Sequence, residues 1–339
     1  MTSPRTTENG AVWPALPVDD WAPTRDTLHL WTQIVGKIRM ANTPVVNHWW
    51  NVMLYVTTTG LTTSPIPYGD RTFQIDFDFE DHRLGITTND GEGRSMKLEP
   101  RTVADFYDEL MAHLDELGLS TRMWTMPVEV PGLDTPFDED VEHASYDGEA
   151  INRFWRSLVQ SDRVFHQFRA RFVGKVSPVH FFWGGFDLAV TRFSGRTAPP
   201  HPGGAPHCGP RVMHEAYSHE VSSAGYWPGG GPEGAFYSYA YPEPPGYRDQ
   251  PLGPAGASWR DDLGGEFVLP YEVVRASDDP DAILLEFLQT TYEAAANTAN
   301  WDRPALEAYG LPEPAPARGR MSEPLLPGVC VRERLRDRR

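Results

Sequence analysis

Two segments of this 339-residue chain match each other without a gap at an offset of 134 residues. They read PVVNHWWNVMLYVTTTGLTTSPIPYG (44–69) and PVHFFWGGFDLAVTRFSGRTAPPHPG (178–203). An internal repeat constrains a fold strongly, because each copy is expected to form the same kind of structural unit. The identical pairs include Pro44/Pro178, Trp49/Trp183, Leu54/Leu188, Thr57/Thr191 and Pro65/Pro199. We therefore interpret the chain as internally duplicated.

Similar patterns surround the two copies in the same order. A helical stripe precedes each copy, an alternating strand follows it, and an amphipathic helix closes each half. The stripes contain Leu28, Trp31, Val35 and Ile38 in the first half, and Ile151, Phe154, Trp155 and Leu158 in the second. The strands are RTFQIDFDFE (71–80) and GAFYSYAYPEP (234–244), and the closing helices begin near Val103 and Pro280. This order predicts an α+β fold with antiparallel sheets, packed helices and pseudo-twofold halves.

The same boundaries divide the chain into four regions. We expect a flexible N-terminus (1–12), a first α+β repeat (13–145), a second α+β repeat (146–310) and a disordered tail (311–339). The tail is rich in proline and ends in RERLRDRR, a composition that cannot form a packed core. The second repeat contains an insertion, residues 204–235, that the first copy lacks.

Composition excludes several classes of function. The formal net charge is −17, from 30 Lys and Arg against 47 Asp and Glu, and such a field repels nucleic acid. The chain has no apolar run of membrane-spanning length and no secretory signal, so we expect no membrane partner. Two cysteines, Cys208 and Cys330, suit a reducing cytoplasm. Phosphate-loop, dinucleotide and nucleophile-elbow motifs are missing, which disfavours nucleotide-dependent chemistry and common serine hydrolysis.

Histidine is concentrated around the insertion. The stretch PHPGGAPHCGPRVMHEAYSHE (200–220) holds four of the 11 histidines. Pro210 indicates the start of a helix running to about Ser222. On such a helix Glu215 and His219 stand one turn apart and point from the same face. A carboxylate and an imidazole in this arrangement supply two metal ligands, and we predict that they are also the catalytic residues.

Two further histidines complete the predicted metal shell. His201 precedes a PGG turn, and His180 begins the strand HFFWGGFDLAV. The two glycines within that strand (184–185) indicate a bulge or a close approach by another group. His29 and Ser218 are candidate hydrogen-bond partners for the ligands. The alternative is that the surface histidines are merely solvated and that His180 is a buried core residue.

Aromatic segments indicate where a small molecule would bind. HWW (48–50), HFFW (180–183) and GYWPGGG (225–231) lie near the repeat or the insertion, and the last is predicted to be a flexible lid. We predict an apolar substrate pocket, the alternative being that these residues only fill the core. The predicted substrate-binding residues are Trp49, Trp183, Tyr226 and Trp227.

Four long phrases carry a family resemblance. They are WPALPVDDWAPTRDTLHLWTQIVGKIRM, VNHWWNVMLYVTTTGLTTSPIPYG, SPVHFFWGGFDLAVTRFSGRTAPPHPGGAP and EAYSHEVSSAGYWPGG. Together they resemble a bacterial family described as a domain of unknown function, DUF5996, from about Trp13 to Trp301. The resemblance implies a single bacterial module and assigns no activity and no functional residue.

We therefore expect a metal-dependent enzyme that acts on a small, partly apolar or aromatic molecule. The predicted cofactor is a divalent ion, Fe or Zn, bound by His201, Glu215, His219 and His180. The ligand types and the aromatic surroundings favour an oxidoreductase of the nonheme-iron type. The alternatives are a zinc-dependent hydrolase, a metal-free acid–base enzyme that uses His219 and Glu215, and a non-catalytic small-molecule binding or scaffold protein.

Overall fold

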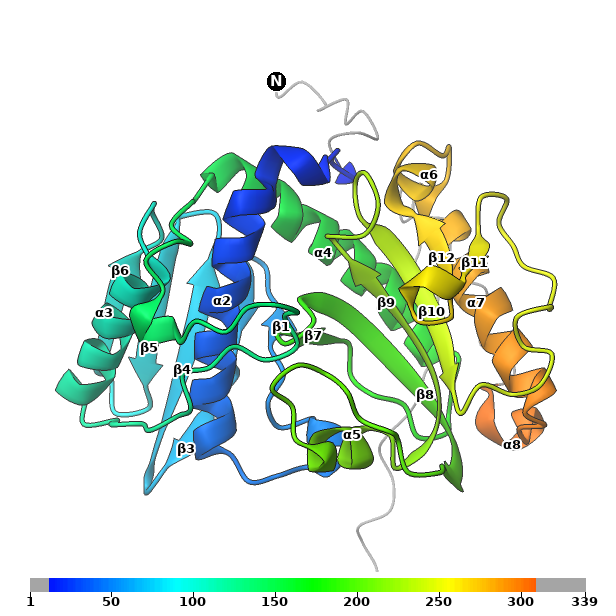
Figure 1. The fold of residues 1–339 in the computed structure, drawn as a ribbon, viewed down its shortest axis with the longest axis horizontal. Coiled ribbons are helices and arrows are strands. Elements are labelled where there is room, and N and C mark those ends of the chain that lie inside the picture. The colour runs from blue at the N-terminus through cyan, green and yellow to red at the C-terminus, as the bar shows by residue number, and fades with distance from the viewer. Residues whose placement is uncertain (1–11, 309–339) are drawn as a thin grey trace, which may run out of the picture. The chain divides into compact units, whose positions relative to one another are not determined.

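The computed structural model describes residues 12–308, which form an α+β fold as predicted (Figure 1). Within this range, seven α-helices accompany two antiparallel sheets of six strands each. The predicted tail lies outside the described residues, as does the N-terminal region apart from residue 12. The α-helices are α2 (Val18–Asn42), α3 (Val103–Glu116), α4 (Gly148–Ala170), α5 (Pro210–Ala216), α6 (Tyr271–Arg275), α7 (Pro280–Thr298) and α8 (Arg303–Leu306). The 3₁₀ helices are η1 (Asn47–Trp49), η2 (Phe137–Glu139) and η3 (Asp261–Leu263).

The first sheet contains the predicted alternating strand at its centre. Phe73, Ile75 and Phe77 of β4 are buried on one face, and the residues between them are half-buried on the other. This alternation is what a strand with one face on the core requires. The strand order is β1 (Tyr55–Val56), β2 (Gly60–Thr62), β4 (Arg71–Asp78), β5 (Arg83–Thr88) and β6 (Gly93–Lys97), with β3 (Ile66–Tyr68) also paired to β4.

Helices α2 and α3 pack together in the first half of the molecule. The predicted stripe of α2 is buried, and Trp31 stacks on Phe106 of α3 with ring centroids 4.5 Å apart. The side chain of Thr102 accepts a hydrogen bond from the Asp105 backbone N–H at 3.0 Å. This contact caps α3 where the sequence predicts its start.

The second sheet is the one that positions the cavity described below. Its order is β11 (Ser258–Arg260), β12 (Glu266–Pro270), β10 (Ala235–Tyr241), β9 (His219–Trp227), β8 (Asp187–Thr197) and β7 (His180–Phe182). Helix α4 packs against β8, and α7 packs against β9, β10 and α4. Both helices lie behind this sheet in Figure 1, so the opposite face of β8, β9 and β10 is free of them.

The two sheets meet at one pair of residues. Leu54, next to β1, and Phe181 of β7 exchange two backbone hydrogen bonds of 3.1 and 2.8 Å. Buried side chains from both sheets belong to one continuous hydrophobic core. No helix among the described residues has the length and apolar character needed to cross a membrane.

The two repeated segments differ in their local structure. The first segment divides into η1, β1, β2 and β3, whereas the second contains β7 and the long strand β8. Both halves do follow the order of a long helix, antiparallel strands and a closing helix. The duplication therefore stays a prediction.

Candidate functional site

The histidine-rich segment forms only the first part of the predicted helix, which begins at Pro210 as expected. Helix α5 ends at Ala216, and β9 begins at His219, which pairs with Thr197 of β8. Glu215 and His219 therefore lie on different elements, and the predicted spacing of one helical turn between them is wrong. The physical reason is that residues 219–227 pair with β8 on one side and with β10 on the other. Two partner strands outweigh the local preference for helix.

Each of the predicted metal ligands in this segment has its own protein partner. The Glu215 carboxylate accepts a hydrogen bond of 3.0 Å from the backbone N–H of His48. The His201 Nδ1 accepts from Gly203 N–H at 3.0 Å, and its ring stacks on Tyr217 with centroids 4.6 Å apart. His219 Nδ1 lies 3.0 Å from the Ser218 hydroxyl oxygen.

The remaining predicted ligand, His180, is fully buried in β7. Burial lowers its pKa to about 3, and the cations Arg39 and Arg169 lower it further. The Tyr55 hydroxyl lies 3.4 Å from its Nε2. Within residues 12–308 no group of three or more His, Cys, Asp or Glu side chains is placed to hold a metal ion. The divalent ion stays a prediction.

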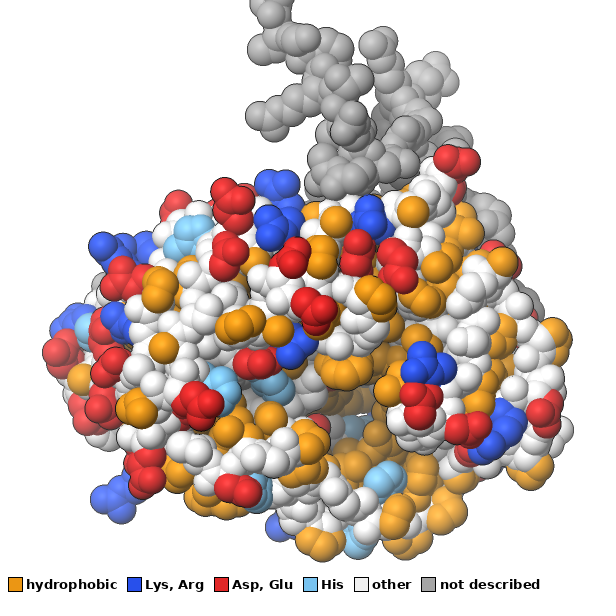
Figure 2. Space-filling model, turned by 45° about the horizontal axis from the view of Figure 1, so that its top comes forward, with side chains coloured by type: hydrophobic (Ala, Val, Ile, Leu, Met, Phe, Trp, Pro, Cys, Tyr) orange, Lys and Arg blue, Asp and Glu red, His pale blue; other side chains and the backbone are white. Residues whose placement is uncertain are grey.

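The structure instead shows a cavity of about 350 Å³ on the free face of the second sheet. Its floor follows the strand period of two, because side chains on alternate positions point to the same face. The surface drawn in Figure 2 is hollowed near its centre, where hydrophobic side chains gather. The floor residues are Asp187, Ala189, Thr191 and Phe193 of β8, Val221, Ser223 and Trp227 of β9, Tyr237 and Tyr239 of β10, and Glu266 of β12.

Three segments far apart in sequence form the other walls of the cavity. They are η1 with the residue that follows it, the loop before η2, and the end of α5. The loop is held by the buried Gln33 of α2, whose amide donates to Val128 O at 2.8 Å and accepts from Val128 N–H at 2.9 Å. This pairing fixes the backbone beside Glu129. The wall residues of these segments are His48, Trp50, Glu129, Ala216 and Tyr217, and Phe182 of β7 and Gly185 of the turn after it complete the lining.

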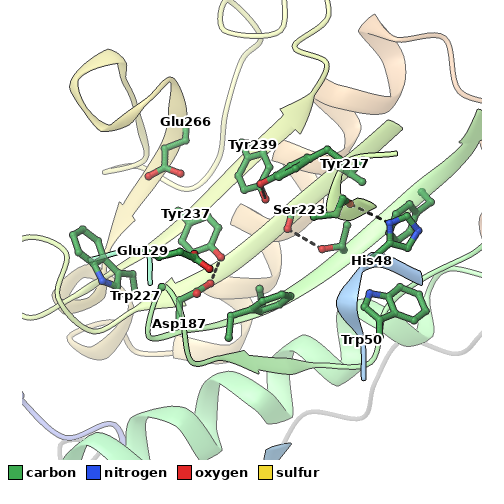
Figure 3. A pocket seen from close by; sticks show the side chains of 17 residues that line it. His48, Trp50, Glu129, Asp187, Tyr217, Ser223, Trp227, Tyr237, Tyr239 and Glu266 are labelled. Carbon is green, nitrogen blue, oxygen red and sulfur yellow. Dashed lines mark hydrogen bonds between the residues drawn. The ribbon is translucent and has the colours of Figure 1, made fainter. Parts of the chain in front are cut away.

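Asp187 is the central polar group of the cavity. The Tyr237 hydroxyl donates a hydrogen bond to its carboxylate (Figure 3). Burial raises the pKa of Asp187 to about 7, the hydrogen bond from Tyr237 opposes this rise, and the charge of Glu129 adds to it. A carboxyl group with this pKa exchanges its proton near neutral pH, as general acids and bases do.

Two more carboxyl groups face the same space. Glu129 points towards Asp187 and Tyr237 in Figure 3, and desolvation of its carboxylate raises its pKa. Burial, together with the charge of Asp187, raises the pKa of Glu266 to about 7. No lysine, arginine or histidine of the described residues forms an ion pair with any of the three.

Glycines make room for this arrangement. A Cβ at Gly225 would collide with the Tyr237 hydroxyl, and one at Gly184 would collide with the Glu129 carboxylate. The pair 184–185 lies in the turn between β7 and β8, so the mid-strand position expected from the sequence is wrong. The expected close approach by another group is confirmed, and that group is Glu129.

Hydroxyl groups line the floor beyond Asp187. The hydroxyl oxygens of Tyr217 and Tyr239 lie 2.8 Å apart, and those of Thr191 and Ser223 lie 2.9 Å apart. Because His201 stacks on Tyr217, this predicted metal ligand supports a cavity residue from behind. The cavity thus offers several hydrogen-bond donors and acceptors to a polar ligand.

The far end of the cavity carries an imidazole. His48 Nδ1 lies 3.0 Å from the Ala216 carbonyl oxygen, which only accepts, so Nδ1 holds the proton. Its Nε2 then accepts from the Lys175 ammonium at 2.6 Å. Burial lowers the pKa of His48, and the charge of Lys175 lowers it further. His48, Trp49 and Glu129 all have a positive φ, between 57° and 61°, and such strain gathers at functional sites.

A second cavity, of about 410 Å³, adjoins the first. His48, Glu129, Phe182, Ala216 and Tyr217 line both cavities. The second cavity is mainly apolar. Its further lining residues include Met40, Trp49, Val52, Met53, Trp124, Val128, Trp183, Cys208, Val212 and Met213.

The predicted substrate-binding residues are divided between cavities and core. Trp49 and Trp183 line the apolar cavity, and Trp227 lines the first cavity. Tyr226 is fully buried on the other face of β9, where it packs on Phe236 and Tyr271. The GYWPGGG segment starts inside β9, so only its Pro/Gly part forms the turn to β10. His29, a predicted hydrogen-bond partner of a ligand, contacts the Gly184 carbonyl at 2.8 Å.

Sequence reasoning missed the carboxyl groups that the structure brings together. A signal was present for the tyrosines, since Tyr237, Tyr239 and Tyr241 share one face of an alternating strand. Asp187 carried a weaker signal, as a lone acid entering the apolar strand DLAV. Glu129 carried none, because its place depends on Gln33 and Gly184, which are remote in the chain.

Comparison with known proteins gives one family match. No curated protein and no solved structure matches the chain. A model of a family of unknown function, DUF5996, matches residues 13–308, which is most of the chain. The chain belongs to the DUF5996 family.

Proposed function

We propose that the protein is an enzyme that transfers protons to and from a small, partly apolar molecule bound in the cavity over β8, β9 and β10. One observation carries the proposal. Asp187 lies in a cavity, hydrogen-bonded to Tyr237, near two other carboxyl groups and without a cationic partner. This environment keeps its proton exchangeable near neutral pH.

The surrounding groups have distinct tasks in such a reaction. Tyr237 orients the Asp187 carboxyl through its hydroxyl group, so one carboxylate oxygen is held and the other faces the ligand. Asp187 donates its proton to the ligand or takes one from it, and Glu129 supplies the opposing negative charge. The tyrosine, serine and threonine hydroxyls bind polar parts of the ligand, and the aromatic walls exclude water.

Turnover of small molecules in a deproteinised bacterial extract tests this proposal. The protein is added far below the concentration of the extract's components, which are followed by liquid chromatography with mass spectrometry so that isomers of equal mass are separated. We expect one component to be consumed in excess of the protein present. Asp187→Asn should slow this consumption by roughly 10²- to 10⁴-fold, the usual contribution of a general acid or base.

Asp249→Asn is the matched control, because Asp249 is exposed and lies outside both cavities. It should leave consumption unchanged. Depletion that stops at one molecule per protein chain would favour the alternative of a non-catalytic binding protein. Equal rates for the wild type and Asp187→Asn would overturn the assignment of Asp187.

The predicted divalent ion and the predicted cytoplasmic location are tested by separate experiments. Elemental analysis after native purification would favour the metal-dependent alternative if Fe or Zn is stoichiometric and is lost in a His219→Ala, Glu215→Ala double variant. The Asp187 mechanism predicts that consumption continues when metal ions are removed by a chelator.

We further propose a cytoplasmic location, on the basis of the low cysteine content. Fractionation of cells would check this location.

A further inference from the structure

The charge of the first cavity selects one class of ligand. Three carboxyl groups line it, and no lysine or arginine does. Lys175, which does not line the cavity, donates to the His48 ring at 2.6 Å and lies over the Trp50 ring, 5.3 Å from its centroid. An anionic ligand would meet repulsion from Glu129, Asp187 and Glu266, and the Lys175 ammonium is already engaged by His48.

The walls of the same cavity suit an organic cation. Phe182, Tyr217, Trp227, Tyr237 and Tyr239 are aromatic residues on its lining. Aromatic faces attract ammonium groups through their negative quadrupole, and the attraction increases when the cation is desolvated. A cation that enters this cavity therefore gains from both the carboxylates and the rings.

The second cavity suits an apolar group covalently attached to that cation. It adjoins the first through shared walls that include Glu129, and it is lined by methionine, valine and tryptophan. Its one lysine, Lys37, is already engaged by the backbone oxygens of Trp124, at 3.0 Å, and Met126. The two volumes, about 350 and 410 Å³, are each in the range of small-molecule sites.

We propose that the two cavities form one bipartite site for an amphiphilic organic cation. Its ammonium head lies between Glu129 and Asp187, and its apolar tail occupies the space lined by Trp49, Val212 and Met213. This inference rests on the proposed location of the active site and names the class of its substrate.

Calorimetric titration with simple alkyl probes tests the proposal. The probes are methylammonium, n-hexylammonium, hexanol and hexanoate. We expect n-hexylammonium to bind most tightly of the four probes. Its affinity should exceed that of methylammonium by about fourfold for each methylene group by which the two probes differ. Tighter binding of hexanoate, equal binding of hexanol, or no binding of n-hexylammonium to the folded protein would each overturn the proposal.

Variants distinguish the binding of the ammonium head from the binding of the apolar tail. Glu129→Gln should weaken n-hexylammonium at least tenfold while leaving the weak binding of hexanol unchanged. Val212→Trp, and independently Met213→Trp, should fill the apolar cavity and remove the gain from tail length without affecting methylammonium. Val173→Trp is the control, because Val173 is 65 % exposed and lines neither cavity. If affinity still increases with tail length in both cavity-filling variants, the tail binds somewhere other than the apolar cavity.

Proton release gives a further readout. Asp187 faces Tyr237 of β10, Glu129 of the loop and Glu266 of β12, and a cation bound there lowers the proton affinity of these carboxyl groups. Binding near pH 7 should release a proton, seen as a heat that varies with the ionisation enthalpy of the buffer. Binding without proton release would contradict the placement of the head.

The outcomes also separate this inference from the proposed function. If n-hexylammonium binds as described but no extract component is consumed, the cation site stands and the enzyme proposal fails. If Asp187 is required for consumption of an anionic or neutral component while no ammonium probe binds, the enzyme proposal stands and the cation site fails.

Discussion

At Asp187 the fold keeps a carboxyl group away from both bulk water and positive charge. Its hydrogen-bond partner is the neutral hydroxyl of Tyr237, and the negative charge of Glu129 acts on it as well. The folded state therefore disfavours the ionised form of Asp187, which destabilises the fold at high pH. Proteins commonly tolerate such a loss of stability at functional sites.

This cost gives a pH-dependent prediction at the residue scale. The pKa of Asp187 is raised to about 7 in the folded chain, while an unfolded aspartate titrates near 4. Between these values the folded state binds more protons than the unfolded state, so this group destabilises the fold progressively as pH rises from about 4 to about 7. Asp187→Asn should therefore raise the melting temperature at pH 8 and change it little at pH 4. Asp249→Asn should show no such difference, and a stabilisation by Asp187→Asn that is equal at both pH values would contradict the raised pKa.

At the scale of elements, the pairing of β9 with β10 decides where Tyr237 lies. Tyr237 stands opposite Gly225, and its ring lies across the space that a side chain at position 225 would fill. The same strand register aligns Thr191, Ser223 and Tyr239 in a second row of the floor. A strand glycine here is used for close packing rather than for an unusual backbone angle.

Gly225→Ala tests this arrangement. The added methyl group should displace the Tyr237 hydroxyl from Asp187 and reduce ligand turnover at least tenfold, while circular dichroism shows an intact fold. Tyr237→Ala in the same chain removes the colliding hydroxyl together with the two ring carbons that would also collide, so the double variant should lose less stability than the sum of the two single variants. Gly85→Ala, in β5 where nothing lies within 4 Å of the added atom, is the control. Additive losses in the double variant would contradict the predicted collision.

At the scale of the whole described molecule, both sheets draw on one hydrophobic core and meet at Leu54 and Phe181. The cavities have walls from both halves, because His48 and Glu129 come from the first and β8 to β10 from the second. Breaking either half should therefore disturb the site.

A shared core predicts cooperative unfolding of the folded unit. Far-UV circular dichroism, tryptophan fluorescence and calorimetry should give coincident transitions, and the calorimetric enthalpy should equal the van't Hoff enthalpy. Leu54→Pro removes the donor that bonds to Phe181 O and should lower the single transition as a whole. Two separated transitions, in the wild type or in this variant, would mean that the halves fold independently.

The sequence alone determined the elements whose signals are local. The alternation in β4, the stripe of α2 and the start of α3 near Val103 depend on neighbours within a few residues, and the α+β class followed from their order. The tertiary structure decided what depends on distant partners. Residues 219–227 became a strand because β8 and β10 flank them, which separated Glu215 from His219. Asp187, Glu129 and Tyr237 became neighbours because strand register and the Gln33 contact join segments up to about a hundred residues apart, and no pattern of period two or 3.6 encodes such a meeting.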